Sequence, residues 1–126
     1  MTQPNDELTE LVIGAAIEVH RHLGPGLLES TYSECFSWEL RAVGLKFARQ
    51  VQVPVIYKGE ALAAMYRLDF VIENEVIVEI KATEKLAAVH EAQLLTYLRH
   101  TGISVGLLLN FNSAVLKDGI RRLRVR

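Results

Sequence analysis

The stretch of sequence that decides the fold is RLDFVIENEVIVEIK, residues 67–81. It contains two runs, 67–72 and 76–81, in which apolar and polar residues partly alternate. Such alternation is typical of strands, because successive side chains of a strand point to opposite faces of a sheet. The polar residues 73–75 between the runs have the character of a turn, so the stretch predicts a β-hairpin.

This predicted hairpin brings two carboxylates together. With a loop of three residues, regular antiparallel pairing places Asp69 opposite Glu79 and Arg67 opposite Lys81. Carboxylates that face one another across a ladder repel. The two basic residues could offset that repulsion, and a hard divalent cation would do so better, because Mg²⁺ and Mn²⁺ prefer carboxylate and water oxygens. A functional role for the pair therefore predicts a loop of odd length or a bulge.

Outward from the hairpin, the periodicity of the chain predicts three helices and three further strands. Apolar residues at steps of three and four predict helices over residues 6–23, about 27–43 and 85–100, the last capped by Thr83. The first strand of the hairpin is expected to begin at residue 61, after a turn at residues 58–60. Further strands are expected around residues 51–55, 103–111 and 119–126, and Pro54 predicts that the strand over 51–55 lies at an edge. The fold class is therefore α/β (α+β), with the order ααβββαββ and a mixed central β-sheet flanked by helices.

Composition narrows the class of protein. The 126 residues predict a single domain over residues 1–126, and a hydrophobic content of 50% supports a proper core. The net charge of -1 excludes nucleic-acid binding by bulk charge alone, and together with the hydrophobic content it argues against disorder. The lone Cys35 excludes an internal disulfide framework, predicts a small core residue and suits a cytoplasmic location. No apolar run is long enough to predict a membrane span.

Two of the predicted helices carry polar residues that could lie near the carboxylates. Glu29 and Tyr32 are three residues apart, so they share a face at the start of the second helix. His90, Gln93 and Tyr97 follow one stripe of the third helix. This stripe predicts a polar wall beside the strand that carries the second carboxylate.

Three motifs, in this order along the chain, resemble those of a known family. GLLESTY, residues 26–32, matches the signature of the GxxExxY proteins, which belong to the PD-(D/E)XK nuclease-like superfamily. Asp69 followed by EIK at residues 79–81 resembles the Asp…Glu-x-Lys core of that superfamily. QLLTY, residues 93–97, resembles the helix motif of its RecB-type exonucleases, and the Asn110-Phe111 pair is similar to the GxxExxY group. The similarity extends from about His20 to Leu123.

This resemblance implies a restriction-endonuclease-like core and a metal-dependent nuclease that hydrolyses phosphodiester bonds of nucleic acid. The choice between DNA and RNA stays open, with DNA favoured. It implies Mg²⁺ or Mn²⁺ as the cofactor, with Glu29, Asp69, Glu79 and the backbone carbonyl of Ile80 as ligands. Lys81 would orient or activate the attacking water, or stabilise charge on the phosphate. Residues implied to support the site or to contact nucleic acid are Gln93, Tyr97, Tyr32, Arg67 and His90.

Other interpretations stay open at this point. The carboxylates could form a solvated face with neighbouring basic residues. The chain could be a catalytically weak nucleic-acid-binding or accessory module, or an assembly module that forms a homodimer through the edge strand near Pro54. In the last predicted strand, Arg122, Arg124 and Arg126 face one way, and this pattern favours a charged, aggregation-resistant edge over a rail of phosphate contacts.

Overall fold

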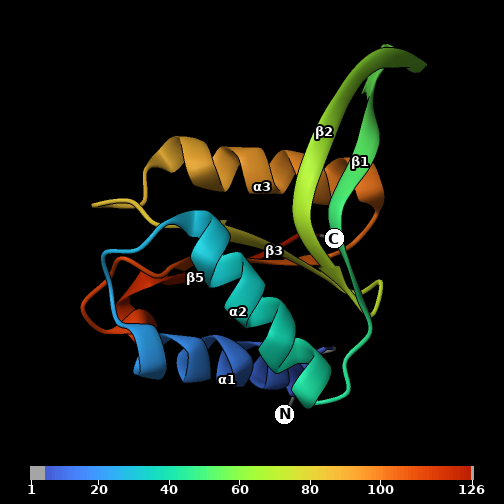
Figure 1. Cartoon of the computed structure of the whole chain (residues 1–126). Coiled ribbons are helices and arrows are strands. Elements are labelled where there is room, and N and C mark those ends of the chain that lie inside the picture. The colour runs from blue at the N-terminus through green and yellow to red at the C-terminus, as the bar shows by residue number, and fades with distance from the viewer. Residues whose placement is uncertain (1–4, 126) are drawn as a thin grey trace.

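The computed structural model describes residues 5–125, which form one five-stranded sheet with helices on both of its faces (Figure 1). The strands follow one another across the sheet in chain order, β1-β2-β3-β4-β5. The helices are α1 (Asp6–Leu23), α2 (Glu29–Ala42), α3 (Ala88–Thr101) and the short 3₁₀ helix η1 (Leu116–Gly119). The strands are β1 (Phe47–Tyr57), β2 (Glu60–Ile72), β3 (Val76–Lys81), β4 (Val105–Asn110) and β5 (Ile120–Arg124).

The centre of the sheet is the parallel pair β3 and β4, joined by α3. All other neighbouring strands are antiparallel, so the sheet is mixed, as the sequence predicts. Every residue of β4 is buried, which explains its nearly continuous apolar sequence. At Gly106 an added Cβ would lie 2.9 Å from a methyl carbon of Leu94, so the glycine lets α3 pack close to β4.

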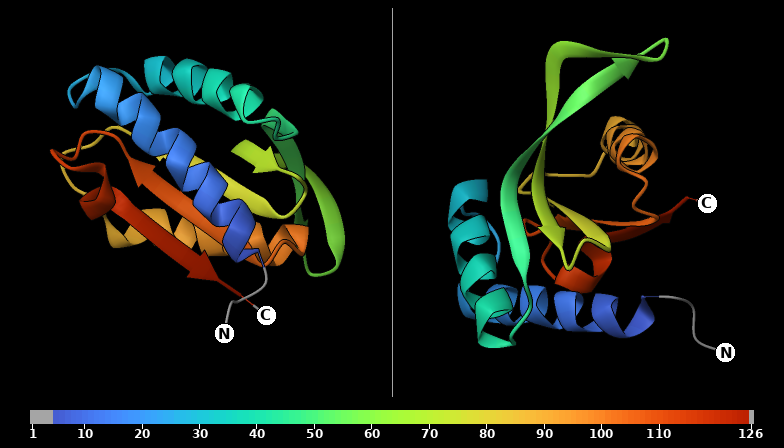
Figure 2. Two further views of the ribbon diagram at one scale, coloured as in Figure 1. Left: turned by 90° about the horizontal axis from the view of Figure 1, so that it is seen from below. Right: turned by 90° about the vertical axis from the view of Figure 1, so that its right-hand side faces the viewer.

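The helices divide between the two faces of the sheet and create two apolar cores (Figure 2). α1 and α2 cover one face, where residues such as Phe36 of α2 and Phe70 of β2 are fully buried. α3 covers the other face, where Leu94 packs with Leu68 and Ile77. No helix within residues 5–125 is long and apolar enough to cross a membrane.

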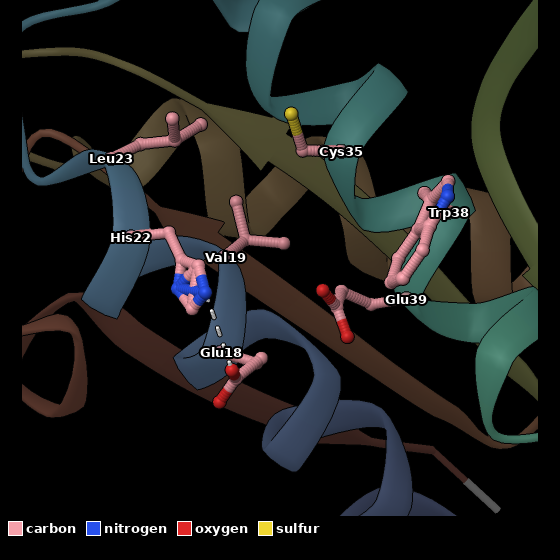
Figure 3. A pocket seen from close by; sticks show the side chains of 7 residues that line it. All are labelled: Glu18, Val19, His22, Leu23, Cys35, Trp38 and Glu39. Carbon is pink, nitrogen blue, oxygen red and sulfur yellow. Dashed lines mark ion pairs between the residues drawn. The ribbon is translucent and has the colours of Figure 1, made fainter.

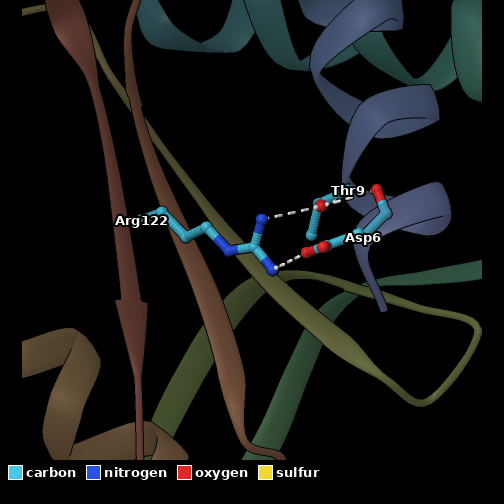
Figure 4. A network of polar contacts seen from close by, with 3 residues as sticks. All are labelled: Asp6, Thr9 and Arg122. Carbon is cyan, nitrogen blue, oxygen red and sulfur yellow. Dashed lines mark hydrogen bonds and ion pairs between the residues drawn. The ribbon is translucent and has the colours of Figure 1, made fainter. Parts of the chain in front are cut away.

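The last strand is tied to the first helix by Arg122 (Figure 4). Its Nη2 lies 2.8 Å from Oδ1 of Asp6, and its Nη1 donates to Oγ1 of Thr9 at 3.2 Å. Arg122 therefore connects β5 to α1 in addition to placing a positive charge on an edge strand. Arg126, the last member of the predicted arginine row, lies outside the described residues.

The start of the third helix differs from the sequence-based prediction. α3 begins at Ala88 with Ala87 as its N-cap residue, so the predicted Thr83 cap is wrong. The N–H of Ala87 donates to Nδ1 of His90 at 3.0 Å, which satisfies a backbone donor at this helix end. Thr83 lies in the preceding loop because its backbone is held by Asn110 of β4, a contact that local sequence does not reveal.

Candidate functional site

The hairpin β2–β3 has the loop of three residues that the predicted register requires. Its register pairs Ile72 with Val76 and Phe70 with Val78, which makes Asp69 and Glu79 the next residues in line. The register confirms the predicted alignment of the two strands up to Phe70 and Val78, one position before the two carboxylates. Arg67 does not pair with Lys81: β2 leaves β3 here, and Arg67 pairs with Gln52 of β1.

At this point each carboxylate takes the place of a backbone acceptor. The N–H of Asp69 donates to Oε2 of Glu79 at 2.8 Å, and the N–H of Ile80 donates to Oδ2 of Asp69 at 2.8 Å. These two bonds hold both side chains between the separating strands. Oδ1 of Asp69 and Oε1 of Glu79 take no part in these two hydrogen bonds, so one oxygen of each carboxylate remains for another ligand.

Both carboxylates are held at an energetic cost. Glu79 is 4% exposed, and its burial, with a contribution from the charge of Asp69, raises its pKa to about 8. Burial also raises the pKa of Asp69. The backbone hydrogen bonds and the positive charge of Lys81 act in the opposite direction on both pKa values but do not cancel the effect of burial. A cation bound here would reduce the repulsion between the two carboxylates.

Glu29 lies near this pair without joining it. It is the first residue of α2 and is exposed, and its charge raises the pKa of Asp69 and of Glu79. Within the part of the chain that the structure describes, no three His, Cys, Asp or Glu side chains come close enough to hold a metal ion. The three-carboxylate ligand set implied by the resemblance is therefore not assembled in this structure, and a ligand role for Glu29 stays a prediction.

The loop in front of Glu29 is fixed by its own motif. Gly26 has a φ of 97°, which side-chain-bearing residues rarely adopt, and its N–H donates to Oδ1 of Asn112 at 3.0 Å. The hydroxyl of Tyr32 donates to the carbonyl of Gly24 at 2.6 Å and accepts from the N–H of Leu27 at 3.1 Å. Tyr32 is fully buried and supports this loop, so of the two roles implied for it, support of the site or contact with nucleic acid, its position agrees with support.

Asn110 connects the end of β3 to the end of β4. Its Oδ1 accepts from the N–H groups of Thr83 at 3.1 Å and Asn112 at 3.2 Å, and its Nδ2 donates to the carbonyl of Thr83 at 3.0 Å. The N–H of Phe111 donates to the carbonyl of Lys81 at 2.9 Å. Residues 110–112 thus link the strand end that carries Lys81 to the loop that precedes Glu29.

Sequence reasoning missed Asn112 and noticed Asn110 only through the resemblance. The available signal was the pair of asparagines in NFN, residues 110–112, at the carboxyl end of a buried strand. The carboxyl ends of the parallel strands β3 and β4 lie at one edge of the sheet, where side chains from both can meet.

The polar stripe of α3 lies partly at the carboxylates. Burial, followed by the charges of Glu79 and Asp69, raises the pKa of Tyr97, and a side-chain hydrogen bond with Gln93 acts in the opposite direction. Tyr97 therefore lies beside the pair, with Gln93 next to it. His90 instead lies in the first turn of α3, where its Nδ1 serves the helix end.

Tyr66 is a further neighbour that the sequence did not indicate. Its ring centroid lies 5.4 Å from that of Tyr97 and 5.2 Å from that of His100. Because Tyr66 belongs to β2 and the other two rings to α3, this aromatic group fixes the helix against the strand that carries Asp69.

A separate pocket of about 150 Å³ lies between α1 and α2 and contains none of these residues (Figure 3). It is lined by Glu18, Val19, His22, Leu23, Cys35, Trp38 and Glu39. Cys35 packs against the core there, as the sequence predicts, and His22 pairs with Glu18 at 3.7 Å. The carboxylate pair instead lies where β2 and β3 separate.

Comparison with known proteins agrees with the fold. A family model described as the PD-(D/E)XK nuclease superfamily matches residues 6–123. No curated protein and no solved structure gives a significant match. Members of this superfamily generally use divalent metals. The match covers nearly the whole chain, and the chain therefore belongs to the PD-(D/E)XK nuclease superfamily.

Proposed function

We propose that this protein is a nuclease that hydrolyses phosphodiester bonds of nucleic acid, DNA rather than RNA, with Mg²⁺ or Mn²⁺. The observation that carries the proposal is the carboxylate pair of the buried Glu79 and the partly buried Asp69, at the point where β2 and β3 separate. We treat the sheet and its helices as one domain, residues 1–126. A cytoplasmic location, predicted from the lone Cys35, belongs to the same proposal.

The donor set suits a hard divalent cation. Each carboxylate has one oxygen that takes no part in the two hydrogen bonds from backbone N–H groups, and burial raises the pKa of each. Mg²⁺ in proteins is commonly held by one or two carboxylates together with water and substrate phosphate. Two carboxylates and the carbonyl of Ile80 would be sufficient for such a site, and Glu29 would add a ligand through a bridging water. The bound cation would lower the pKa of a water and polarise the phosphate.

The remaining residues have roles that follow from where they lie. Lys81 follows Glu79 by two residues on the same strand and would orient the attacking water or stabilise charge on the phosphate. Gln93 and Tyr97 form a wall beside the pair and hold its geometry. Arg67 lowers the pKa of Asp69 by its charge and is exposed, so it is available to a phosphate of the substrate.

The distribution of charge supports nucleic acid as the substrate. Residues 6–43, which form α1 and α2, contain seven acidic and two basic residues. Residues 44–125, which form the sheet and α3, contain eight acidic and eleven basic residues. Although the whole chain has a net charge of -1, the sheet and α3, which carry the carboxylate pair, contain more basic than acidic residues, and this excess attracts a phosphate backbone.

The test is a calorimetric titration with Mn²⁺ followed by a cleavage assay. We expect saturable binding in the wild type and in Glu75→Ala, a matched control that removes an exposed carboxylate from the same hairpin, and none in Asp69→Ala. Lys81→Ala should bind Mn²⁺ but cleave neither single- nor double-stranded DNA. Cleavage that persists in Glu79→Ala would overturn the proposal.

The same experiment separates the second candidate, an accessory module that binds nucleic acid without hydrolysing it. The excess of basic residues in the sheet and α3 favours binding whether or not cleavage occurs. Salt-dependent binding of DNA by the wild type, with no cleavage at any Mg²⁺ or Mn²⁺ concentration, would establish this alternative.

A further inference from the structure

The outer halves of β1 and β2 form a two-stranded ribbon that projects from the rest of the molecule (Figures 1 and 2). β3 pairs with β2 only from Phe70 to Ile72, so within residues 5–125 no further strand pairs with β2 over residues 60–67. The base of the ribbon is covered by α3, against which Val51, Val53 and Tyr66 pack. A ribbon of two strands is marginally stable in water without further cover.

The projecting part of this ribbon is apolar and exposed. Residues 53–57 and 61–66 contain no charged side chain. Four large apolar side chains are at least 39% exposed here: Ile56, Tyr57, Leu62 and Met65. An exposed apolar patch that is free of charge on a projecting element is typical of an interaction site.

The two edges of the ribbon are not equivalent. The β1 edge contains Pro54, which has no backbone donor, and its register shifts between Pro54 and Ile56. Both features obstruct the addition of a strand. The edge near Pro54 is therefore a poor route to a dimer. The β2 edge over residues 61–66 contains neither proline nor charge, so it is the edge open to another strand.

We propose that residues 61–66 of β2 pair antiparallel with the same residues of a second copy of this chain. A two-fold axis perpendicular to the sheet leaves every side chain on its own face of the sheet. The residue at the axis must then pair with itself in the second copy. Ala63 and Ala64, in the middle of the segment, are the two candidates for this central residue, and each defines one register. With Ala63 at the centre, Leu62 faces Ala64 of the second copy and Glu60 faces its Tyr66. Neither register places like charges opposite one another.

The second copy is the occupant that the charge pattern favours. A nucleic acid would select basic side chains, and residues 53–66 contain only Lys58 and Glu60 as charged residues, of opposite sign. A self-pairing strand must avoid charge at its centre, which this strand does. The ribbon offers fewer than the roughly 20–30 residues per side of a standard interface, so the dimer should dissociate in the micromolar range.

The test is sedimentation velocity over protein concentrations from about 1 to about 200 μM, without metal or nucleic acid, so its outcome does not depend on the nuclease proposal. The wild type should show a monomer–dimer equilibrium. Ala63→Lys and Ala63→Glu should each raise the dissociation constant at least about tenfold, because like charges then meet at or beside the axis. Ala63 is exposed and has no register partner in β1, so neither change should disturb the protomer.

An equimolar mixture of the two variants should restore the dimer, because opposite charges then face each other. Ala48→Lys, which alters an exposed alanine at the base of β1, is the matched control and should associate like the wild type. A wild type that stays monomeric, or a mixture that associates no better than either variant alone, would overturn the proposal. A monomer whose DNA affinity changes with the charge at residue 63 would assign the ribbon to nucleic acid instead.

Discussion

The replacement Glu79→Gln should stabilise the metal-free protein at neutral pH. The folded state raises the pKa of Glu79 from 4.5 to about 8, so between these values the folded protein binds a proton that the unfolded chain releases. The stability of the wild type must therefore fall as the pH rises through this window. Glutamine is neutral in both states, and its side-chain oxygen can still accept from the N–H of Asp69.

The size of the effect follows from the same pKa values. At pH 7 the displacement of the titration from 4.5 corresponds to about 3 kcal/mol, since one pKa unit is about 1.4 kcal/mol. Near pH 4.5 the wild type and the variant should differ by less than about 1 kcal/mol. For a chain of this length, about 3 kcal/mol corresponds to roughly 10 °C in Tm.

Urea unfolding followed by circular dichroism, in the presence of EDTA and from about pH 5 to about pH 8, measures the effect. The free energy of unfolding of Glu79→Gln should exceed that of the wild type by an amount that grows with pH. Glu75→Gln, on an exposed side chain of the same hairpin, should follow the wild type. Equal pH slopes for wild type and Glu79→Gln, or a less stable variant at pH 7, would refute the reasoning.

Three other predictions concern metal binding and the contacts that position the site. The affinity for Mn²⁺ should rise with pH up to about 8, because protons compete with the metal for Glu79; calorimetry at several pH values measures this, and a flat profile would contradict it. Asn110→Ala removes three hydrogen bonds of a buried side chain and should lower the free energy of unfolding by about 2–4 kcal/mol. Asn112→Ala removes one hydrogen bond and should lower it by about 1 kcal/mol. Equal losses of the two variants in urea titrations would argue against a bridging role for Asn110. A double-mutant cycle with Arg122→Met and Asp6→Asn should give a coupling of about 0.5–1 kcal/mol that weakens with salt, and a coupling of zero would show that this partly exposed pair does not hold β5 to α1.

Most of the secondary structure could be predicted from sequence because its causes are local. The apolar period of residues 6–23 and the alternation within 67–81 depend on neighbours a few residues apart, and both elements form as predicted. The nearly continuous apolar run before Asn110 predicted a strand, and β4 forms there with every residue buried. The third helix was predicted to start three residues too early, since its N-terminal boundary depends on contacts between Thr83 and Asn110.

The candidate site was predictable in its composition but not in its geometry. The sequence by itself determined that Asp69 and Glu79 come together, because a hairpin with a loop of three residues sets the register of its own strands. Only the tertiary structure showed that each carboxylate replaces a backbone acceptor, that Glu29 does not join the pair, and that the outer half of β2 is exposed in a two-stranded ribbon. These features depend on where a strand leaves its neighbour and on contacts across more than eighty residues, such as that between Gly26 and Asn112. No local pattern encodes such contacts, because they arise only when the packing of the helices on the sheet brings distant segments together.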